Sequence, residues 1–317
     1  MGLRRIYDPT IEAFAKTIPR LDASDVEKIR AQVEDYRNLM ESKGMARPTD
    51  IRIKEIDHSI PGPEGTPDIP IRIYMPKKRT EAGPGYVNFH GGGFIFGDLE
   101  SEHHRSLLMA AEGGAVTVGI DYRLAPENPF PAAVEDCYAG LKWVAENATQ
   151  LKIDLSRLAI GGASAGGNLA AAVAQMARDR SGPEIRLQML MYPVLDDRCD
   201  TLSMKNGEDS YIITRQNVLD CWRHYLGQDQ RDVSPYAAPA RATDLRNLPT
   251  AYIMTCEHDP LRDEAISYAM RLMDAGVSVE LHNYPGTVHG FDYLTPSDIS
   301  TRAVNDEVYA FKRTMGF

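Results

Sequence analysis

The chain has 317 residues, of which 43% are hydrophobic, and its formal charge is −10 at pH 7. A chain of this length can bury about three quarters of the surface that it exposes when unfolded, which suits one large domain with a small appendage. The acidic balance, without a basic cluster, argues against binding to nucleic acid or to an anionic membrane surface, because both would repel the chain.

The cysteines and the first residues of the chain indicate the cellular compartment of the protein. Four cysteines lie far apart in the sequence and form no C-x-x-C pair. They predict buried thiols in a reduced cytoplasmic protein rather than disulfides, redox chemistry or a metal site. Residues 1–6 include two arginines but no apolar segment follows them, and no run is long enough to span a bilayer, so we do not expect a secreted form.

A helix is predicted near the start of the chain, beginning at Ser24. Ser24 and Glu27 have the spacing of a capping box, in which two side chains satisfy backbone N–H groups at the helix start. Apolar residues then recur at helical spacing up to Met40 and would form one apolar face. Because this face precedes the first predicted strand, we expect residues 1–45 to cover a binding site as part of a helical cap.

The rest of the chain indicates one α/β body. Alternating isoleucines in 51–56 and 69–73 predict antiparallel strands at one edge of a sheet. From Val87 onward, segments of strand length alternate with helical segments, which is typical of a doubly wound, mostly parallel sheet flanked by helices. The predicted strands are 86–89, 115–121, 157–161, 185–192, 251–256 and 277–282, and the predicted helices are 132–146, 169–178 and 260–275.

A polar stretch with a helical run at 216–226 interrupts this alternation. We expect the insertion, residues 197–235, to complete the cap, which leaves 46–196 and 236–317 as the two parts of the body. Five aromatic side chains are candidates to face a pocket beneath the cap, with ordinary packing between cap and body as an equally good alternative for each: Phe14, Tyr36, Tyr211, Trp222 and Tyr225.

Residues 162–166 form a G-x-S-x-G motif between the predicted strand 157–161 and the helix 169–178. In such a strand-to-helix turn the central residue, Ser164, takes a strained backbone conformation that exposes its hydroxyl. The glycines on either side avoid clashes with the neighbouring strand and helix. Ser164 is therefore a candidate nucleophile. The structural alternative is a glycine-rich helix start that this serine caps.

Three glycines, Gly91 to Gly93, directly follow a histidine at the end of the predicted strand 86–89. Such a run leaves backbone N–H groups uncovered, as an oxyanion hole requires. We expect Gly92, Gly93 and Ala165, the residue after the serine, to donate these N–H groups, with Gly91 as the reserve donor. Neither glycine segment has the full pattern of a phosphate-binding loop.

A serine hydroxyl needs a general base, and the base needs a group that orients it. In the chain order serine, acid, histidine, the base lies late in the sequence, which leaves His282 and His289. His282 falls in the predicted strand 277–282, whereas His289 lies in the loop beyond it, so we expect His289 to be the base. Asp259 follows the strand 251–256 and precedes a proline that favours a loop, so it is the expected acid.

Other acids receive structural roles. Glu257, Asp263 and Glu264 also follow the strand 251–256, and we expect Asp263 and Glu264 to complement the dipole at the start of the helix 260–275. Asp196 and Glu208 could polarise the mouth of the site, but solvated acids are the better interpretation.

Two further polar segments are also interpreted as structural. Residues 121–127 would form a strand end and a buried turn that supports the glycine run. His103 and His104 lack the HExxH spacing of a zinc site, so we expect them on a helix surface or at the pocket edge.

Several motifs now stand in one order along the chain: His90-Gly91-Gly92-Gly93, Asp121-Tyr122-Arg123-Leu124-Ala125-Pro126-Glu127, the serine motif, Asp259-Pro260-Leu261 and His289-Gly290-Phe291. Together they resemble the bacterial hormone-sensitive-lipase-like family of α/β-hydrolases, from about Tyr74 to the C-terminus. The resemblance implies an α/β-hydrolase fold and a carboxylesterase with the triad Ser164, Asp259 and His289, an oxyanion hole and a mostly helical lid. One departure is Ala163, where the family usually has Asp or Thr, so any hydrogen bond of that side chain is lost.

The expected reaction is hydrolysis of an ester through an acyl-enzyme, with no cofactor and no metal. The resemblance implies uncharged small-molecule esters with short or medium acyl chains. No nucleic acid and no membrane span are expected, and a homodimer is left open. An amidase or lactonase would use the same triad. A small-molecule receptor on a hydrolase scaffold, as in the similar plant gibberellin receptors, is disfavoured because His289 is retained.

Overall fold

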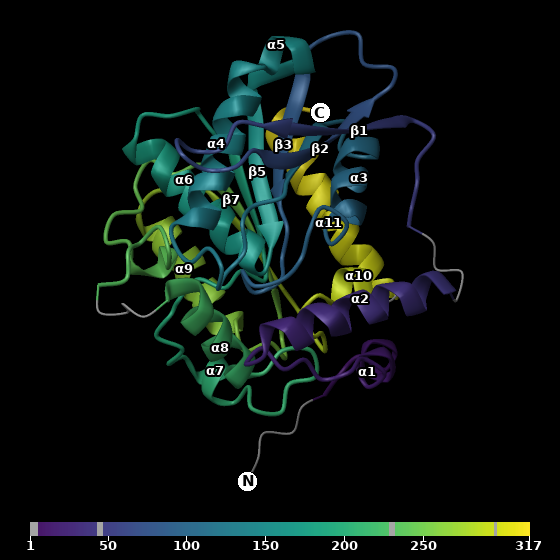
Figure 1. The fold of residues 1–317 in the computed structure, drawn as a ribbon, viewed down its shortest axis with the longest axis vertical. Helices are drawn as coiled ribbons and strands as arrows, with labels where there is room; N and C mark the ends of the chain where they lie inside the picture. The colour runs from purple at the N-terminus through teal and green to yellow at the C-terminus, as the bar shows by residue number, and fades with distance from the viewer. Residues whose placement is uncertain (1–5, 43–46, 228–231, 295–296) are drawn as a thin grey trace.

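The computed structural model describes residues 6–42, 47–227, 232–294 and 297–317 (Figure 1). Within these residues the centre is one eight-stranded sheet in the order β1-β2-β4-β3-β5-β6-β7-β8. β1 pairs antiparallel with β2 and β2 with β4, and all the other pairs are parallel. The strands are β1 (Ile53–Ile60), β2 (Ile69–Pro76), β3 (Gly83–Phe89), β4 (Val116–Ile120), β5 (Ile153–Ala163), β6 (Leu187–Met191), β7 (Thr250–Cys256) and β8 (Val279–Tyr284).

The helices lie before, between and after these strands. They are α1 (Pro9–Ala15), α2 (Val26–Ser42), α3 (His103–Ala111), α4 (Ala132–Glu146), α5 (Ala148–Leu151), α6 (Ala165–Asp179), α7 (Leu202–Lys205), α8 (Arg215–Leu226), the 3₁₀ turn η1 (Pro239–Arg241), α9 (Arg262–Asp274), α10 (Phe291–Leu294) and α11 (Asp298–Met315). The predicted α/β fold, with an antiparallel edge and a mostly parallel sheet, is therefore confirmed. Several boundaries differ from the prediction. For example, α6 starts directly after Ser164, β5 starts at Ile153, and β1 starts at Ile53, which leaves Ile51 exposed in a turn.

The start of α2 differs from the prediction by one residue. Asp25 caps this helix, because its Oδ1 accepts a hydrogen bond from the N–H of Lys28 at 3.0 Å. The hydroxyl of Ser24 donates instead to Asp22 at 2.6 Å. The predicted capping box of Ser24 and Glu27 is wrong. Aspartate caps a helix as well as serine does, and here it stands directly before the first helical residue.

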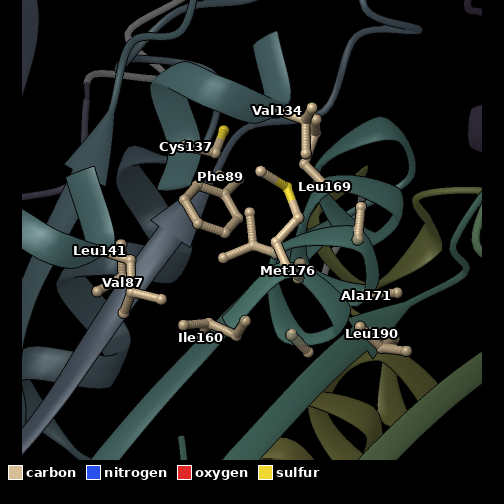
Figure 2. Packing of buried hydrophobic residues seen from close by; sticks show 14 of the residues in the cluster. Val87, Phe89, Val134, Cys137, Leu141, Ile160, Leu169, Ala171, Met176 and Leu190 are labelled. Atoms are coloured by element: carbon tan, nitrogen blue, oxygen red, sulfur yellow. The ribbon is translucent and has the colours of Figure 1, made fainter. Parts of the chain in front are cut away.

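Alternate residues of the parallel strands pack on opposite faces of the sheet. Val87 and Phe89 of β3 belong to a core that α4, α6 and α9 complete (Figure 2). Tyr86, which directly precedes Val87 in β3, belongs to a second core with α3 and α11 on the other face. This alternation follows from the two-residue period of a strand. Helices cover both faces, so loops at the strand ends are the remaining place for a site.

Four helices gather at one end of the molecule. Figure 1 shows α1, α2, α7 and α8 together at the lower end of the view, where β5 ends. They come from two segments, one before the first strand and one between β6 and β7. The carboxyl ends of the parallel strands therefore face helices from two segments that add no strand to the sheet.

Candidate active site

The predicted site residues follow four parallel strands. The glycine run follows β3, Ser164 follows β5, Asp259 lies three residues after β7, and His289 lies five residues after β8. Because these strands are parallel neighbours in one sheet, their carboxyl ends share one edge.

Ser164 occupies the sharp turn between β5 and α6. Its φ of 58° and ψ of −116° are sparsely populated by residues other than glycine. A Cβ on Gly162 or on Gly166 would overlap with the carbonyl oxygen of Phe89. The strained serine and the need for both glycines agree with the turn predicted from the sequence. Ser164 is half-buried, and its N–H is held by the carbonyl of Met191 at 2.9 Å.

His289 and Asp259 form a buried pair. His289 Nδ1 lies 2.7 Å from Asp259 Oδ2, and the other carboxylate oxygen accepts the N–H of Leu261 at 2.9 Å. The two side chains are 8% and 3% exposed, so water competes little for this contact. An ionised carboxylate can only accept, so Nδ1 is the donor and Nε2 of the neutral ring is left as an acceptor.

A buried histidine supports the glycine run. The ring of His90 stacks on Tyr122 with centroids 4.0 Å apart, and the Tyr122 hydroxyl donates to the His90 carbonyl at 2.8 Å. Burial lowers the pKa of His90 to about 4, so the ring is neutral at ordinary pH. The N–H of Ala125 donates to the carbonyl of Phe94 at 2.9 Å. These contacts agree with the supporting role expected for residues 121–127.

The glycine run has a backbone that other residues rarely adopt. Gly92 and Gly93 have φ values of 114° and 57°. Within the described residues, no hydrogen bond takes up the N–H groups of Gly92, Gly93 or Ala165. All three donors are therefore available to an acceptor outside the fold.

Ser164, Gly91 to Gly93 and His289 line one mostly apolar pocket of about 400 Å³. Helix α2 provides one wall and helix α8 another. The apolar side chains of these two walls include Ile29, Val33, Tyr36, Val218, Cys221 and Trp222. Asp259 does not reach the pocket and lies behind the histidine.

Two of the five aromatic candidates, Tyr36 and Trp222, line this pocket. The other three do not. Tyr225 is buried and stacks on Phe94 with centroids 3.8 Å apart, and the Tyr211 hydroxyl donates to Glu12 at 3.1 Å. Phe14 of α1 also lies outside the pocket lining. For Tyr225, which packs on the body residue Phe94, the alternative of ordinary packing between cap and body holds.

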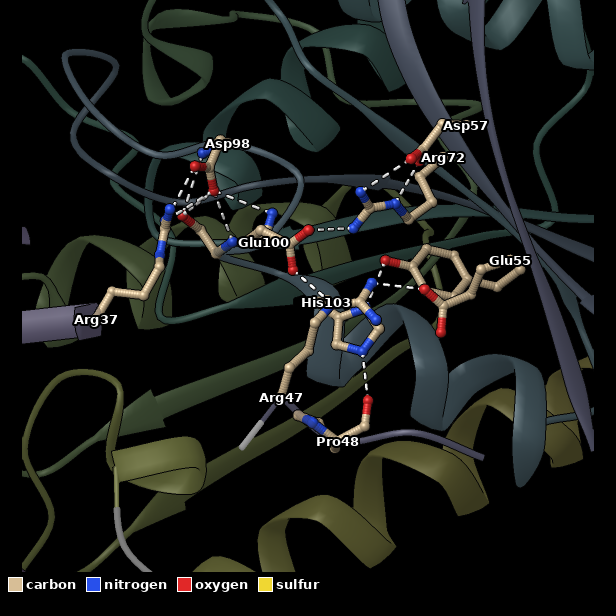
Figure 3. A network of polar contacts seen from close by, with 11 residues as sticks. Arg37, Arg47, Pro48, Glu55, Asp57, Arg72, Asp98, Glu100 and His103 are labelled. Atoms are coloured by element: carbon tan, nitrogen blue, oxygen red, sulfur yellow. Dashed lines mark hydrogen bonds and ion pairs between the residues drawn. The ribbon is translucent and has the colours of Figure 1, made fainter. Parts of the chain in front are cut away.

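Ion pairs fasten α2 and the residues after it to the segment that follows the glycine run (Figure 3). Arg37 of α2 pairs with Asp98 at 2.9 Å, and Arg47 pairs with Glu100 at 2.7 Å. Arg30 of α2 donates to the carbonyl of Ile95, two residues beyond the glycine run, at 2.8 Å. The wall formed by α2 is thus attached to the loop that would hold the oxyanion.

Glu264 lies in the first turn of α9, as expected, but it also has partners outside that helix, and the structure corrects the role expected for Asp196. Glu264 is only 2% exposed, and its Oε1 accepts the N–H groups of Leu195 at 2.6 Å and Asp196 at 3.3 Å. Burial holds the pKa of Glu264 well above its ordinary value. Asp196 is buried and pairs with Arg198 at 2.6 Å, so its description as a solvated acid is wrong. Glu208 is exposed, as expected.

The remaining candidates have structural partners. Asp263 accepts the N–H of Ser203 at 2.7 Å and so joins α7 to α9. His103 is buried, with Nδ1 2.9 Å from the Tyr74 hydroxyl, which corrects its expected surface position. His104 is exposed and lines the pocket, as expected for a residue at its edge.

Sequence analysis missed a buried charged cluster at the pocket, two members of which, Glu102 and Arg105, are among its lining residues. Arg105 of α3 is 1% exposed and contacts Glu102, Asp292 and Glu307. Its only sequence signal is a charged residue shortly before the apolar run Leu107 to Ala111 of the same helix.

Two features are absent from residues 6–42, 47–227, 232–294 and 297–317. No helix there is long and apolar enough to cross a membrane. No group of three or more His, Cys, Asp or Glu side chains there is arranged to hold a metal ion.

Comparisons with known proteins show the family to which this fold belongs. The α/β-hydrolase fold family matches residues 86–293. The chain is 40% identical over 316 residues to carboxylesterase NlhH of Mycobacterium tuberculosis, covering 97% of this chain and 96% of the relative. It is 38% identical over 312 residues to esterase LipI of the same organism, covering 96% and 94%. A solved bacterial heroin esterase is 40% identical, with a TM-score of 0.94 over 98% of this chain and 99% of that chain.

A serine elbow, a glycine loop and a histidine–aspartate pair at one edge of such a sheet define a serine hydrolase of the α/β-hydrolase fold. Within that class, the family match and the nearly full-length identities show that the chain belongs to the bacterial hormone-sensitive-lipase-like carboxylesterases.

Proposed function

We propose that the chain hydrolyses carboxylic esters with Ser164 as nucleophile, His289 as general base and Asp259 as the acid that orients the histidine. The N–H groups of Gly92, Gly93 and Ala165 would hold the oxyanion, with Gly91 in reserve. The observation that carries the proposal is the pocket in which Ser164, the glycines and His289 meet, with Asp259 2.7 Å from the histidine on its buried side.

The chemistry follows from these positions. His289 Nε2 takes the proton of the Ser164 hydroxyl as the serine oxygen attacks the ester carbonyl. Asp259 stabilises the imidazolium that forms, and the free N–H groups stabilise the negative oxygen. The histidine then gives its proton to the leaving alcohol. A water molecule repeats the attack on the acyl-enzyme, which releases the acid and restores the serine.

The pocket supports small, uncharged esters as the substrate class. A volume of about 400 Å³ is near the lower end of the range of roughly 300–1,000 Å³ that ligand pockets span. Its mostly apolar lining offers little to a charged acyl chain. We therefore propose short to medium acyl chains, bound beneath a cap that residues 1–45 and 197–235 form over the catalytic domain, 46–196 and 236–317.

A serine-reactive organophosphorus probe tests the nucleophile directly. Mass spectrometry after labelling should find the adduct on Ser164, and Ser164→Ala should remain unlabelled. An adduct on another serine, at equal rate in Ser164→Ala, would contradict the proposal.

A substrate panel tests the class. Nitrophenyl esters from acetate to dodecanoate should show a maximum of kcat/KM at short or medium chains, and the nitroanilide of the best acid should be hydrolysed far more slowly. Comparable turnover of ester and amide would assign an amidase instead. The cytoplasmic location, the homodimer and the absence of a cofactor stay predictions.

A further inference from the structure

The cluster around Arg105 joins three parts of the fold at the active-site pocket. Arg105 lies on α3 and is 1% exposed. Its guanidinium contacts Glu102 of the same segment at 3.0 Å, Asp292 of α10 at 2.9 Å and Glu307 of α11 at 2.5 Å. Asp292 and Glu307 are fully buried side chains.

Tyr192 links this cluster to the histidine. Its hydroxyl donates to Asp292 Oδ1 at 2.8 Å and accepts from Arg105 at 3.2 Å. Its ring packs edge-on against the ring of His289, with centroids 4.7 Å apart at 61°. Asp259 holds the Nδ1 edge of the imidazole, and Tyr192 supports the ring by packing.

Tyr192 also has a strained backbone. It follows β6 with a φ of 35°, which residues with a side chain rarely adopt. Such strain persists only where the surroundings determine the conformation, and it is concentrated at functional sites. The two hydrogen bonds of the Tyr192 hydroxyl provide part of that constraint.

The chain just after the histidine is held by the same cluster. Helix α10 begins at Phe291, two residues after His289, and its second residue is Asp292. Asp292 therefore fixes the end of the histidine loop to α3 through Arg105. The carbonyl of Phe291 also accepts the hydroxyl of Ser300 at 3.1 Å.

Stability does not explain such a cluster well. Burying one cation with three acids is opposed by desolvation, and a buried ion pair often adds little net stability compared with apolar packing. Burial raises the pKa of Glu102 above its ordinary value and that of Glu307 to about 7, because desolvation disfavours the charged form of each carboxyl group. The cluster instead fixes the positions of α3, α10 and α11 relative to one another.

We propose that Arg105 is a positioning residue for His289, acting through Tyr192 and Asp292. Arg105 fixes the ring of Tyr192, against which the imidazole packs, and it fixes helix α10, which begins two residues after His289. The inference rests on the proposed role of His289 as base. A displacement of about 1 Å in a catalytic group can reduce the rate by about 10²-fold, so a partial loosening should be visible in kcat.

Tyr192→Phe tests the link, because it keeps the ring and removes the hydroxyl. We expect kcat to fall about tenfold and KM to stay within about twofold, since only proton transfer is disturbed. Tyr284→Phe is the matched control. Tyr284 is 2% exposed, and its hydroxyl donates to Asp306 at 2.8 Å, away from the pocket lining. It should lose a similar amount of thermal stability and keep its kcat.

Arg105→Lys tests the origin of the effect. Lysine keeps the charge, but its single nitrogen cannot replace the three guanidinium nitrogens, of which Nη2 donates to Asp292 and Tyr192 while Nη1 and Nε donate to Glu307 and Glu102. The same separation of kcat from KM is therefore expected. A kcat within twofold of wild type for Tyr192→Phe, or equal losses in Tyr192→Phe and Tyr284→Phe, would overturn the proposal, even if Arg105→Lys failed to fold. His289→Ala distinguishes a failure of the proposed base from a failure of the proposed positioning by Arg105. If that variant retains turnover, His289 is not the base.

Discussion

Replacing Gly93 by alanine would disturb the glycine loop at a contact with the cap. Gly93 has a φ of 57°, and a Cβ on it would overlap with Cys221 Sγ of α8 while lying 3.4 Å from Cys221 Cβ. The obstacle is therefore one sulfur atom on the neighbouring helix. Removing that atom by Cys221→Ala should leave an ordinary contact.

The expected magnitude has two parts. Alanine in a left-handed conformation costs roughly 1–2 kcal/mol. Overpacking against the thiol adds about 1–3 kcal/mol. If the loop relieves the overlap by moving, the Gly93 N–H leaves its place, and a lost oxyanion donor raises the barrier by about 3–4 kcal/mol, or 10²–10³-fold in kcat. Cys221→Ala should remove the overpacking part and restore at least tenfold of the lost kcat.

The assay is a double-mutant cycle over Gly93→Ala and Cys221→Ala, with kcat on a butyrate ester and the free energy of unfolding in urea. Two controls separate the cost of backbone strain from the cost of overpacking. Gly276→Ala, at a φ of 83° with no atom within 4 Å, should show the backbone strain alone and an unchanged kcat. Gly92→Ala meets the backbone carbonyl of Phe96, so Cys221→Ala should not rescue it.

Two results would refute this reasoning. If Gly93→Ala lowers stability equally with and without Cys221→Ala, α8 does not pack on the glycine loop as described. If Gly93→Ala behaves like Gly276→Ala, losing stability but not kcat, then the Gly93 N–H is not an oxyanion donor.

Four further predictions concern the triad, the buried acid and the cap. Ser164→Ala should reduce kcat by about 10⁶-fold with an unchanged circular dichroism spectrum, and substantial residual turnover would contradict its role. Asp259→Asn should cost about 10⁴-fold in kcat and Asp263→Asn less than about tenfold; a reversed order would transfer the role of acid. Burial raises the folded-state pKa of Glu307 from 4.5 to about 7, so its contribution to stability is largest below pH 4.5 and is lost as pH rises through 7. The wild type should therefore be more stable relative to Glu307→Gln in urea at pH 5.5 than at pH 8, and a pH-independent difference would count against this pKa. Deleting residues 1–45 should weaken the preference among acyl chain lengths more than the rate on the acetate ester, whereas an unchanged profile in a folded truncation, checked by near-UV circular dichroism, would remove this segment from the binding site.

The sequence predicted what depends on local patterns. The turn at Ser164 could be recognised because its glycines, the preceding strand and the following helix lie within about twenty residues. The pairing of His289 with Asp259 followed from chain order and loop position, and the structure brings the two together. In both cases the prediction depends on the order and spacing of residues in the sequence.

What the sequence could not predict depends on distant partners. Glu264 was assigned to a helix start, yet the N–H groups that it binds belong to Leu195 and Asp196, almost seventy residues earlier. The Arg105 cluster draws its members from α3, α10 and α11, with no spacing that relates them. Tyr211 lies in a loop without periodicity, where no pattern tells which neighbour faces the pocket. It is Ile212 that lines the pocket.

The helices α2 and α8 form pocket walls but add no strand to the sheet. Substitutions on their pocket faces therefore leave the sheet and its strand pairing untouched. In evolutionary terms, the walls can diverge among relatives while the reaction chemistry stays constant. For protein engineering, these two helices are accordingly the segments to exchange between relatives when a different ester is to be hydrolysed.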